Sequence, residues 1–144
     1  MATVEQKVEE RLAEFGVRYT HGRRRVVSAL GRADGPRSAA ELAKSIGAKV
    51  PLSTLYRSLG VLEDAGIVAP HHGTRGITRY ELAEWLSGHH HHLVCVDCGV
   101  VEDVIVPKGR EAAIRDLTDD LARTAGFAPL DHVLEIEGRC SRCR

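Results

Sequence analysis

The sequence lacks the features of membrane-spanning and exported proteins. None of its apolar runs approaches the ~20 residues that a membrane helix requires. The polar start at residues 1–7 lacks the apolar core of a signal peptide. We therefore expect a cytoplasmic protein with no membrane partner, whose cysteine thiols stay reduced and available to a metal ion.

Internal repeats, low-complexity tails and net charge are also missing. With 144 residues, 43% of them hydrophobic, the chain can form one ordinary domain or two small ones. The zero net charge hides an uneven distribution. Residues 1–75 carry 12 Lys and Arg against 8 Asp and Glu, and residues 76–144 carry 8 against 12. The basic first half suits contact with phosphates, and the acidic second half suits cations.

A further absence concerns enzymatic function. A zinc-dependent hydrolase or deaminase would need a general-base carboxylate in a His-x-Glu context, and no histidine here has a glutamate two residues later. We therefore expect no catalytic residues and no small-molecule substrate. Among non-enzymatic functions, one alternative is an interaction domain held together by zinc, or a metal store, that does not bind DNA.

The few cysteines form two C-x-x-C pairs, Cys95 with Cys98 and Cys140 with Cys143. Four thiolates are the ligand set of a closed structural zinc site, which leaves no open position for chemistry. The alternatives are a redox dithiol, which uses one pair beside a βαβ unit, and a disulfide framework, which belongs in a secreted chain. The spacing favours structural Zn²⁺.

Four consecutive histidines, at positions 89–92, lead into the first cysteine pair. If Cys95 lies on a strand, His90 and His92 point to one face while His89 and His91 point to the other. The run can therefore serve two different metal sites. A solvated polar run and an expression tag are the alternatives, but the run merges with an apolar strand, which favours ligation.

The first half has the pattern of a winged helix-turn-helix domain. Apolar residues have helical spacing within residues 4–15, 26–30, 38–46 and 53–65, and Ser38 with Glu41 forms a capping box. Strand-like segments at residues 67–69 and 77–82 follow, on either side of a turn-rich segment at 71–76. Helices followed by a hairpin predict this fold.

Several residues of this half are suited to DNA. Residues 18–25 include four arginines, Tyr19 and Thr20, which suit phosphate contact. The helix at 53–65 exposes the face opposite its leucines, as a recognition helix does, and Arg75 lies near the hairpin tip. The residues expected to contact DNA are Arg18, Arg23, Ser53, Thr54, Tyr56, Arg57 and Arg75.

The second half predicts a small sheet with one helix. Strands are expected at residues 93–96, 100–106 and 133–136, with a helix carrying Ile114, Leu117 and Leu121 that ends at Gly126. A small sheet with open edges is a plausible dimerisation module, and helix-turn-helix proteins usually bind two-fold operators as dimers.

Five motifs together resemble the Fur (ferric uptake regulator) family of metal-dependent transcriptional repressors, across nearly the whole chain. They are Ser53-Thr54-Leu55-Tyr56-Arg57, Asp64-Ala65-Gly66-Ile67-Val68, Tyr80-Glu81-Leu82, the histidine run with Cys95-Val96-Asp97-Cys98-Gly99, and the terminal cysteine pair. The resemblance implies an α+β fold. It divides the chain into a winged-helix DNA-binding domain at 1–83, a hinge at 84–88 and a metal-binding α/β dimerisation domain at 89–144.

The resemblance also implies the metal ligands. The four cysteines match the family's structural zinc site. The regulatory metal at the hinge falls on Glu81, His90, His92 and Asp103. An additional site falls on His89, His91 and His132 with a carboxylate from the following helix, either Glu111 or Asp116. Arg18 matches the family's minor-groove residue, and Tyr56 and Arg57 match its major-groove contacts.

The implied function is a homodimeric repressor that binds a palindromic double-stranded DNA operator with a divalent corepressor, namely Zn²⁺, Fe²⁺, Mn²⁺ or Ni²⁺. We favour zinc and control of metal homeostasis; the alternative is a peroxide-sensing iron-dependent repressor of the same fold. Pro36 or Arg37 stands where iron and peroxide sensors often have a histidine, and Glu81 stands where zinc sensors commonly have a cysteine. His71 or His72 can supply a missing nitrogen ligand, although exposed loop histidines are the expected reading.

Overall fold

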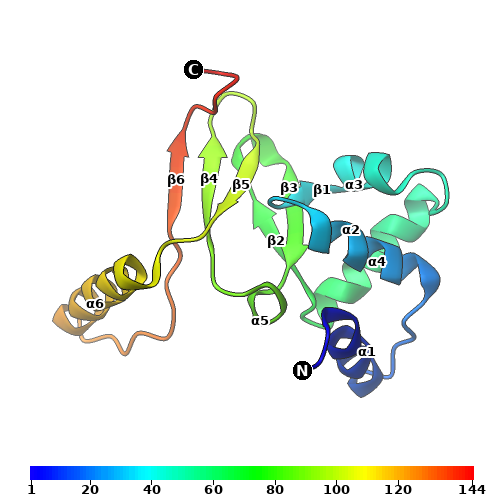
Figure 1. Cartoon of the computed structure of the whole chain (residues 1–144), viewed down its shortest axis with the longest axis horizontal. Coiled ribbons are helices and arrows are strands. Elements are labelled where there is room, and N and C mark those ends of the chain that lie inside the picture. The colour runs from blue at the N-terminus through cyan, green and yellow to red at the C-terminus, as the bar shows by residue number, and fades with distance from the viewer.

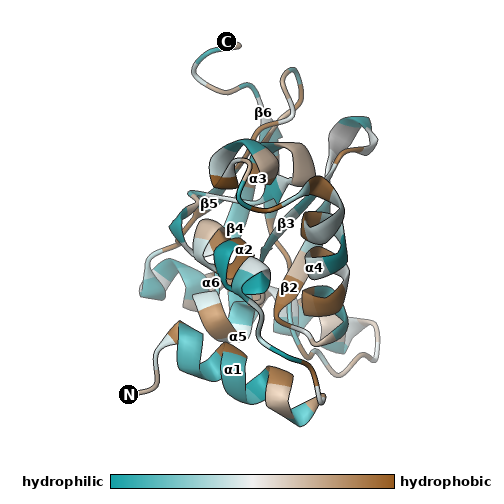
Figure 2. Ribbon diagram, turned by 90° about the vertical axis from the view of Figure 1, so that its right-hand side faces the viewer, coloured by the Kyte–Doolittle hydropathy of each residue, from teal (hydrophilic) through white to brown (hydrophobic). Residues whose placement is uncertain are grey.

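The structure is a computed structural model that describes residues 1–144, apart from the side chain of Thr74. Four helices form the first half: α1 (Val4–Glu14), α2 (His21–Arg32), α3 (Ala39–Ile46) and α4 (Leu52–Asp64). Two of them begin at capping boxes, which Thr3 forms with Gln6 and Ser38 forms with Glu41. In Figure 2, apolar residues alternate with hydrophilic ones along α1 and α4, as expected for helices with one buried face.

The main hydrophobic core lies among these helices and the hairpin that follows them. Its fully buried side chains come from every helix and from the start of the hairpin. The largest are Leu12, Leu42, Leu55, Leu59, Leu62 and Ile67.

A three-stranded antiparallel wing completes the first half. Strands β2 (Val68–His72) and β3 (Thr78–Leu82) form the hairpin around a short 3-10 helix, η1 (Thr74–Gly76). The two-residue strand β1 (Arg37–Ser38) pairs with the other side of β3 and gives the order β1-β3-β2. The sequence does not predict β1, because two residues are too few to show alternation. Helices with this wing confirm the winged-helix fold.

The second half begins with a short helix, α5 (Glu84–Ser87), inside the expected hinge. Strands β4 (His91–Cys95), β5 (Val101–Val104) and β6 (Glu135–Gly138) then form a sheet of order β5-β4-β6. Strand β5 is antiparallel to β4, and β6 is parallel to it. The last strand begins two residues later than the sequence predicts, so Val133 and Leu134 precede it. The α+β class is confirmed.

Helix α6 (Lys108–Thr124) crosses between β5 and β6 and lies at the far end of the molecule from the helices of the first half (Figure 1). None of its residues is buried within the chain. Leu117 is 58% exposed and Leu121 is 63% exposed, as an apolar stripe that a single chain leaves uncovered. The helix position is predicted correctly, but its apolar face does not join a core within one chain.

The two halves contact each other along β5. The backbone N–H of Asp103 donates a 3.0 Å hydrogen bond to the carbonyl of Asp34, in the loop after α2. Gly35 fits closely here, because a Cβ at this position would lie 2.4 Å from the carbonyl oxygen of Val101. In the described part of the chain, no helix combines the length and apolarity needed to cross a membrane.

Candidate metal centres and DNA-contact face

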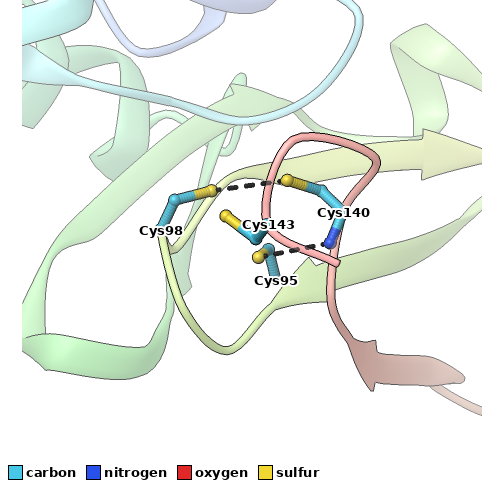
Figure 3. Close-up of side chains that lie close together, drawn as sticks. All are labelled: Cys95, Cys98, Cys140 and Cys143. Atoms are coloured by element: carbon cyan, nitrogen blue, oxygen red, sulfur yellow. Dashed lines mark hydrogen bonds between the residues drawn. The ribbon is translucent and has the colours of Figure 1, made fainter.

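The four cysteines converge at one end of the second sheet (Figure 3). Cys95 ends β4 and Cys98 lies in the following turn, while the other pair lies in the turn after β6. The sulfurs of Cys98 and Cys140 are 3.8 Å apart. In a tetrahedral site with Zn–S bonds of ~2.3 Å, neighbouring sulfurs are about 3.8 Å apart, so this set fits a zinc ion.

Backbone N–H groups also favour thiolates in this cluster. The N–H groups of Cys98 and Cys140 lower the pKa of Cys95 to about 6, and the N–H of Cys140 donates to its sulfur at 3.4 Å. The N–H of Arg142 likewise lowers the pKa of Cys140. A hydrogen bond with the sulfur of Cys140, followed by burial, raises the pKa of Cys143 to about 12, because Cys143 keeps its proton as the donor when no cation is present. The four thiols form no disulfide in the described structure.

A second group of ligands lies where the two halves meet, and we call it the hinge site: Glu81 from β3, His90, His92 from β4 and Asp103 from β5. The Nε2 atoms of His90 and His92 both donate to Oε2 of Glu81, at 2.8 and 3.1 Å. The same nitrogens lie 3.6 and 3.5 Å from Oδ1 of Asp103. These distances bracket the ~3.3 Å between neighbouring ligands of a tetrahedral ion with bonds near 2.0 Å, so the set fits a metal.

The charges of the hinge site depend on one another. Burial would raise the pKa of Glu81, but hydrogen bonds from His92 and His90 outweigh it and lower the pKa. Burial would lower the pKa of His90, but the Gly88 carbonyl and the carboxylates of Glu81 and Asp103 raise it. Burial raises the pKa of Asp103. The acidic pair thus attracts a cation, which in the absence of metal is a proton on imidazole.

A third group lies on the opposite side of β4, as the alternation of the histidine run predicts. The Nε2 atoms of His89 and His132 donate to Oε1 of Glu111 at 2.8 and 2.7 Å. The Nε2 of His91 donates to Oε2 of the same carboxylate at 2.8 Å. Hydrogen bonds from His91, then from His132 and His89, lower the pKa of Glu111 to about 2. Three imidazoles and a carboxylate suit Zn²⁺ and other late first-row ions.

The sequence left open which carboxylate completes this third group. Glu111 completes it, from the first turn of α6. Asp116 is exposed further along α6 and, among the described residues, joins none of the candidate groups. The other ring nitrogen of His89 donates to Glu84, which orients the ring as outer partners of metal ligands do.

The face expected to contact DNA is open on α4. Ser53, Tyr56 and Arg57 are exposed, and Tyr56 is 55% exposed. Thr54 is half-buried beside α2, since a Cβ at Gly22 would lie 3.3 Å from its methyl group. The start of α2 thus lies against the start of α4, which places the basic stretch beside the expected recognition helix.

The basic stretch divides into two parts. Arg18 is exposed, and the Arg23 guanidinium donates to its carbonyl at 2.6 Å. Arg24 instead pairs with Glu5 at 2.9 Å and stacks on Tyr19, whose hydroxyl donates to Glu5 at 3.0 Å. Tyr19 and Arg24 of this stretch therefore already have partners on α1 or beside it, and the phosphate-contact prediction for the stretch stays a prediction.

Two further positions from the sequence have distinct surroundings. Arg75 is exposed at the hairpin tip with a φ of 67°, in the left-handed region. His72 is exposed, as expected for a loop histidine. His71 is different, because its side chain is 14% exposed and its Nε2 donates to Glu135 at 2.6 Å. The expectation of an exposed histidine is wrong at this position, and β2 extends to include both residues.

The fold and these clusters together define a class: a winged-helix DNA-binding protein with a metal-binding second domain. Residues 14–137 match the model of the ferric uptake regulator family. The chain is 34% identical, over 96% of its length and 94% of the relative's, to the ferric uptake regulation protein of Rhizobium leguminosarum bv. viciae. The chain belongs to the ferric uptake regulator family, whose members are metal-responsive transcription regulators and not enzymes.

Solved structures agree with this assignment. The Helicobacter pylori ferric uptake regulator, described as having three functional metal-binding sites, is 25% identical with a TM-score of 0.78, covering 99% of this chain and 94% of that one. A zinc-bound manganese uptake regulator is 34% identical with a TM-score of 0.70, covering 92% and 98%. The family binds DNA operators and forms dimers.

Proposed function

We propose that this chain is a metal-dependent transcriptional repressor that controls metal homeostasis, with the ion of the hinge site as corepressor. One observation carries the proposal: Glu81 belongs to the wing, whereas His90, His92 and Asp103 belong to the second sheet and the segment leading into it. An ion bound by all four restricts the angle between the DNA-binding half and the dimerising half. In a dimer, this restriction fixes the distance between the two recognition helices. That distance then matches two DNA half-sites that lie one helical turn, or a multiple of it, apart.

The proposed DNA contacts follow from the exposed face of α4 and its neighbours. Tyr56 and Arg57 contact base edges in the major groove, near the start of the helix, with Ser53 and Thr54 beside them. Arg18 contacts the minor groove, while Arg23 and Arg75 contact the backbone. A homodimer on a palindromic operator places two such faces on one side of the DNA.

The proposed metals differ between sites. Zn²⁺ is held by the four cysteines as a structural ion, which leaves the hinge site for an exchangeable ion. Imidazole with carboxylate suits Zn²⁺, Fe²⁺, Mn²⁺ or Ni²⁺, and we favour zinc because of its affinity for compact nitrogen and oxygen sites. The site of Glu111, His89, His91 and His132 holds an additional ion that fixes α6 to β4. The related ferric uptake regulator of Helicobacter pylori, with three functional metal-binding sites, supports several ions per chain.

Peroxide sensing through bound iron is the alternative function of this fold. It receives less support, because the segment that would supply a further histidine is occupied by Pro36 and Arg37. The Arg37 guanidinium donates to the carbonyls of Gly35 and Pro36, and neither the side chain of Pro36 nor that of Arg37 offers an imidazole nitrogen to a metal. Finding 2-oxohistidine after mild peroxide treatment of the iron-loaded protein would favour the alternative.

The test is DNA binding as a function of metal, with genomic fragments selected by the zinc-loaded protein. We expect zinc to tighten binding, and by reciprocity the DNA to tighten zinc binding by the same factor. His90→Ala should abolish the metal response while the structural zinc and the fold remain. His72→Ala, which removes an exposed histidine of the wing, is the control. A normal metal response in His90→Ala would rule out the hinge site as the sensor.

A further inference from the structure

A further cluster lies between the wing and the second sheet and includes residues that no predicted site uses. Glu135 is the first residue of β6 and pairs with His92 of β4, so the two side chains lie next to each other on the sheet. Strand β2 of the wing carries His71, which contacts both of them. Its Nε2 lies 2.6 Å from Oε1 of Glu135, and its ring centroid lies 4.9 Å from that of His92. All three residues offer ligand atoms within 4.8 Å of one another.

We propose that His71, His92 and Glu135 form a further binding site for a late first-row divalent ion, the wing site. Two imidazoles and one carboxylate are ligands that such ions take, and three protein ligands leave room for exchangeable water. The ion would take the place of the hydrogen bond that now joins Nε2 of His71 to Oε1 of Glu135. The proposal rests in part on the proposed function, because His92 is a ligand in both the wing site and the hinge site.

The shared residue makes the wing site and the hinge site competitors. Nε2 of His92 already lies 3.1 Å from Glu81 of the hinge site. A neutral imidazole has one free lone pair, so His92 serves one ion at a time. When it serves the wing site, the hinge ion keeps Glu81, His90 and Asp103. The two ions would thus tie different strands of the wing to the second sheet: β3 through the hinge site and β2 through the wing site.

The surroundings of His71 indicate that the wing site binds more weakly than the hinge site. Nδ1 of His71 is buried, and among the described residues it has no hydrogen-bond partner. Ligation through Nε2 leaves the ring proton on this nitrogen, where a strong metal-binding histidine has an acceptor. Loss of such an outer partner typically lowers metal affinity by about 10- to 100-fold. The wing site would therefore fill at higher metal concentrations than the hinge site.

The test uses Co²⁺, whose visible absorption reports its ligands, on the full chain with zinc on the four cysteines. Glu81→Gln with His90→Ala removes the hinge site, and Glu111→Gln removes the third site, while His92 stays in place. This background should bind one Co²⁺ per chain with an absorption typical of nitrogen and oxygen ligands. Adding His71→Ala or Glu135→Gln should abolish that absorption. Adding His72→Ala or Glu137→Gln, which change neighbours on the same two strands, should leave it unchanged.

Two results would overturn the proposal. The first is that the background variant binds no Co²⁺ although it retains one zinc per chain at the cysteines. His71 and Glu135 would then form only a hydrogen bond between the two domains. The other is Co²⁺ binding that is indifferent to His71→Ala. Failure of the proposed function looks different, because the wild-type protein would then bind metal without any change in its affinity for DNA.

Discussion

The backbone N–H of Asp103 donates to the carbonyl of Asp34, and this hydrogen bond of 3.0 Å joins a hinge ligand to the DNA-binding half. Asp34 follows α2, whose first turn lies against the recognition helix α4. In the mechanism proposed above, a movement of β5 on ion binding would reach the loop after α2 through this direct contact. The proposed hinge ion would then act on the DNA-binding half through two connections: the carboxylate of Glu81 on β3 and this loop.

Gly35→Ala should break this contact. An added Cβ would lie 2.4 Å from the Val101 carbonyl and 3.1 Å from Cα of Glu102, and these are backbone atoms that cannot turn aside. We expect the two halves to separate at β5 and the metal response of DNA binding to fall by about 10-fold or more, since about 1.4 kcal/mol of coupling corresponds to that factor. Gly109→Ala, at an open position in the first turn of α6, is the control. Equal metal responses in the two variants would argue against coupling through this loop.

Cys140→Ser should remove the structural zinc. It takes away one of the four thiolate ligands, while the backbone N–H that donates to the sulfur of Cys95 remains. The second sheet has few fully buried apolar side chains, chiefly Val94 and Val101, so it depends on the metal. We expect less than one zinc per chain and a loss of more than about 4 kcal/mol in stability, as for other lost metal sites. Elemental analysis and thermal unfolding measure both, with Ser141→Ala as the control. Unchanged melting without zinc would contradict a structural role.

Metal affinity at the hinge site should rise with pH. Without metal, the carboxylates of Glu81 and Asp103 help raise the pKa of His90 above its ordinary 6.5, so the ring holds a proton near neutrality. An ion must displace that proton, and the cost disappears as pH rises through the raised pKa. The apparent Zn²⁺ affinity, measured by chelator competition between about pH 6 and about pH 8, should increase across this window. In His90→Ala the increase should be smaller, and an identical pH slope would rule out His90 as a titrating ligand.

The sequence predicts those parts of the molecule that depend on local spacing. Alternation along the histidine run correctly places His90 and His92 opposite His89 and His91, because the period of a strand is two. The capping box at Ser38 and the glycine stops give helix positions close to those observed. The family resemblance assigns Glu81 and Asp103 to the same site, although local rules cannot connect residues so distant in sequence.

Other features depend on tertiary contacts that no local pattern records. Strand β1 forms only because Arg37 and Ser38 lie beside β3. His71 has the sequence context of an exposed turn, yet β2 continues through it and turns its ring toward Glu135. The choice of Glu111 over Asp116 depends on where α6 begins after Pro107, and element boundaries are difficult to predict from sequence. Arg24 forms ion pairs with Glu5 and Glu9 of α1, and these contacts depend on how α1 packs against α2.

Arg57 and Arg75 should contribute to DNA binding in different ways. Arg57 lies near the start of α4 on the face expected to read bases, so Arg57→Ala should cost about 1–3 kcal/mol and relax sequence preference. Arg75 lies at the hairpin tip, and Arg75→Ala should weaken binding to all sequences and reduce the salt slope by about one. Titrations of operator and scrambled DNA at several salt concentrations separate the two effects, with Arg110→Ala in α6 as the control. A variant of Arg57 that retains full sequence preference would exclude it from base recognition.

Helix α6 should form part of the dimer interface. Leu117 and Leu121 are more than half exposed in the single chain, as are Val133 and Ile136 on the segment that returns to the sheet. An apolar stripe of this kind is normally covered, and the family forms dimers. Leu121→Glu would place an unpaired charge in that interface at a cost of about 3 kcal/mol, or roughly a 100-fold weaker dimer.

Sedimentation velocity of the zinc-loaded protein measures this effect. Lys108→Glu is the matched control, because it adds a glutamate on the opposite side of α6, in the first turn, where a negative charge favours the helix. We expect Leu121→Glu to become monomeric at concentrations where Lys108→Glu stays dimeric. Since one recognition helix binds only one half-site, the same variant should lose tight operator binding even when its hinge site holds metal. A dimeric Leu121→Glu protein would place the interface elsewhere on the second sheet.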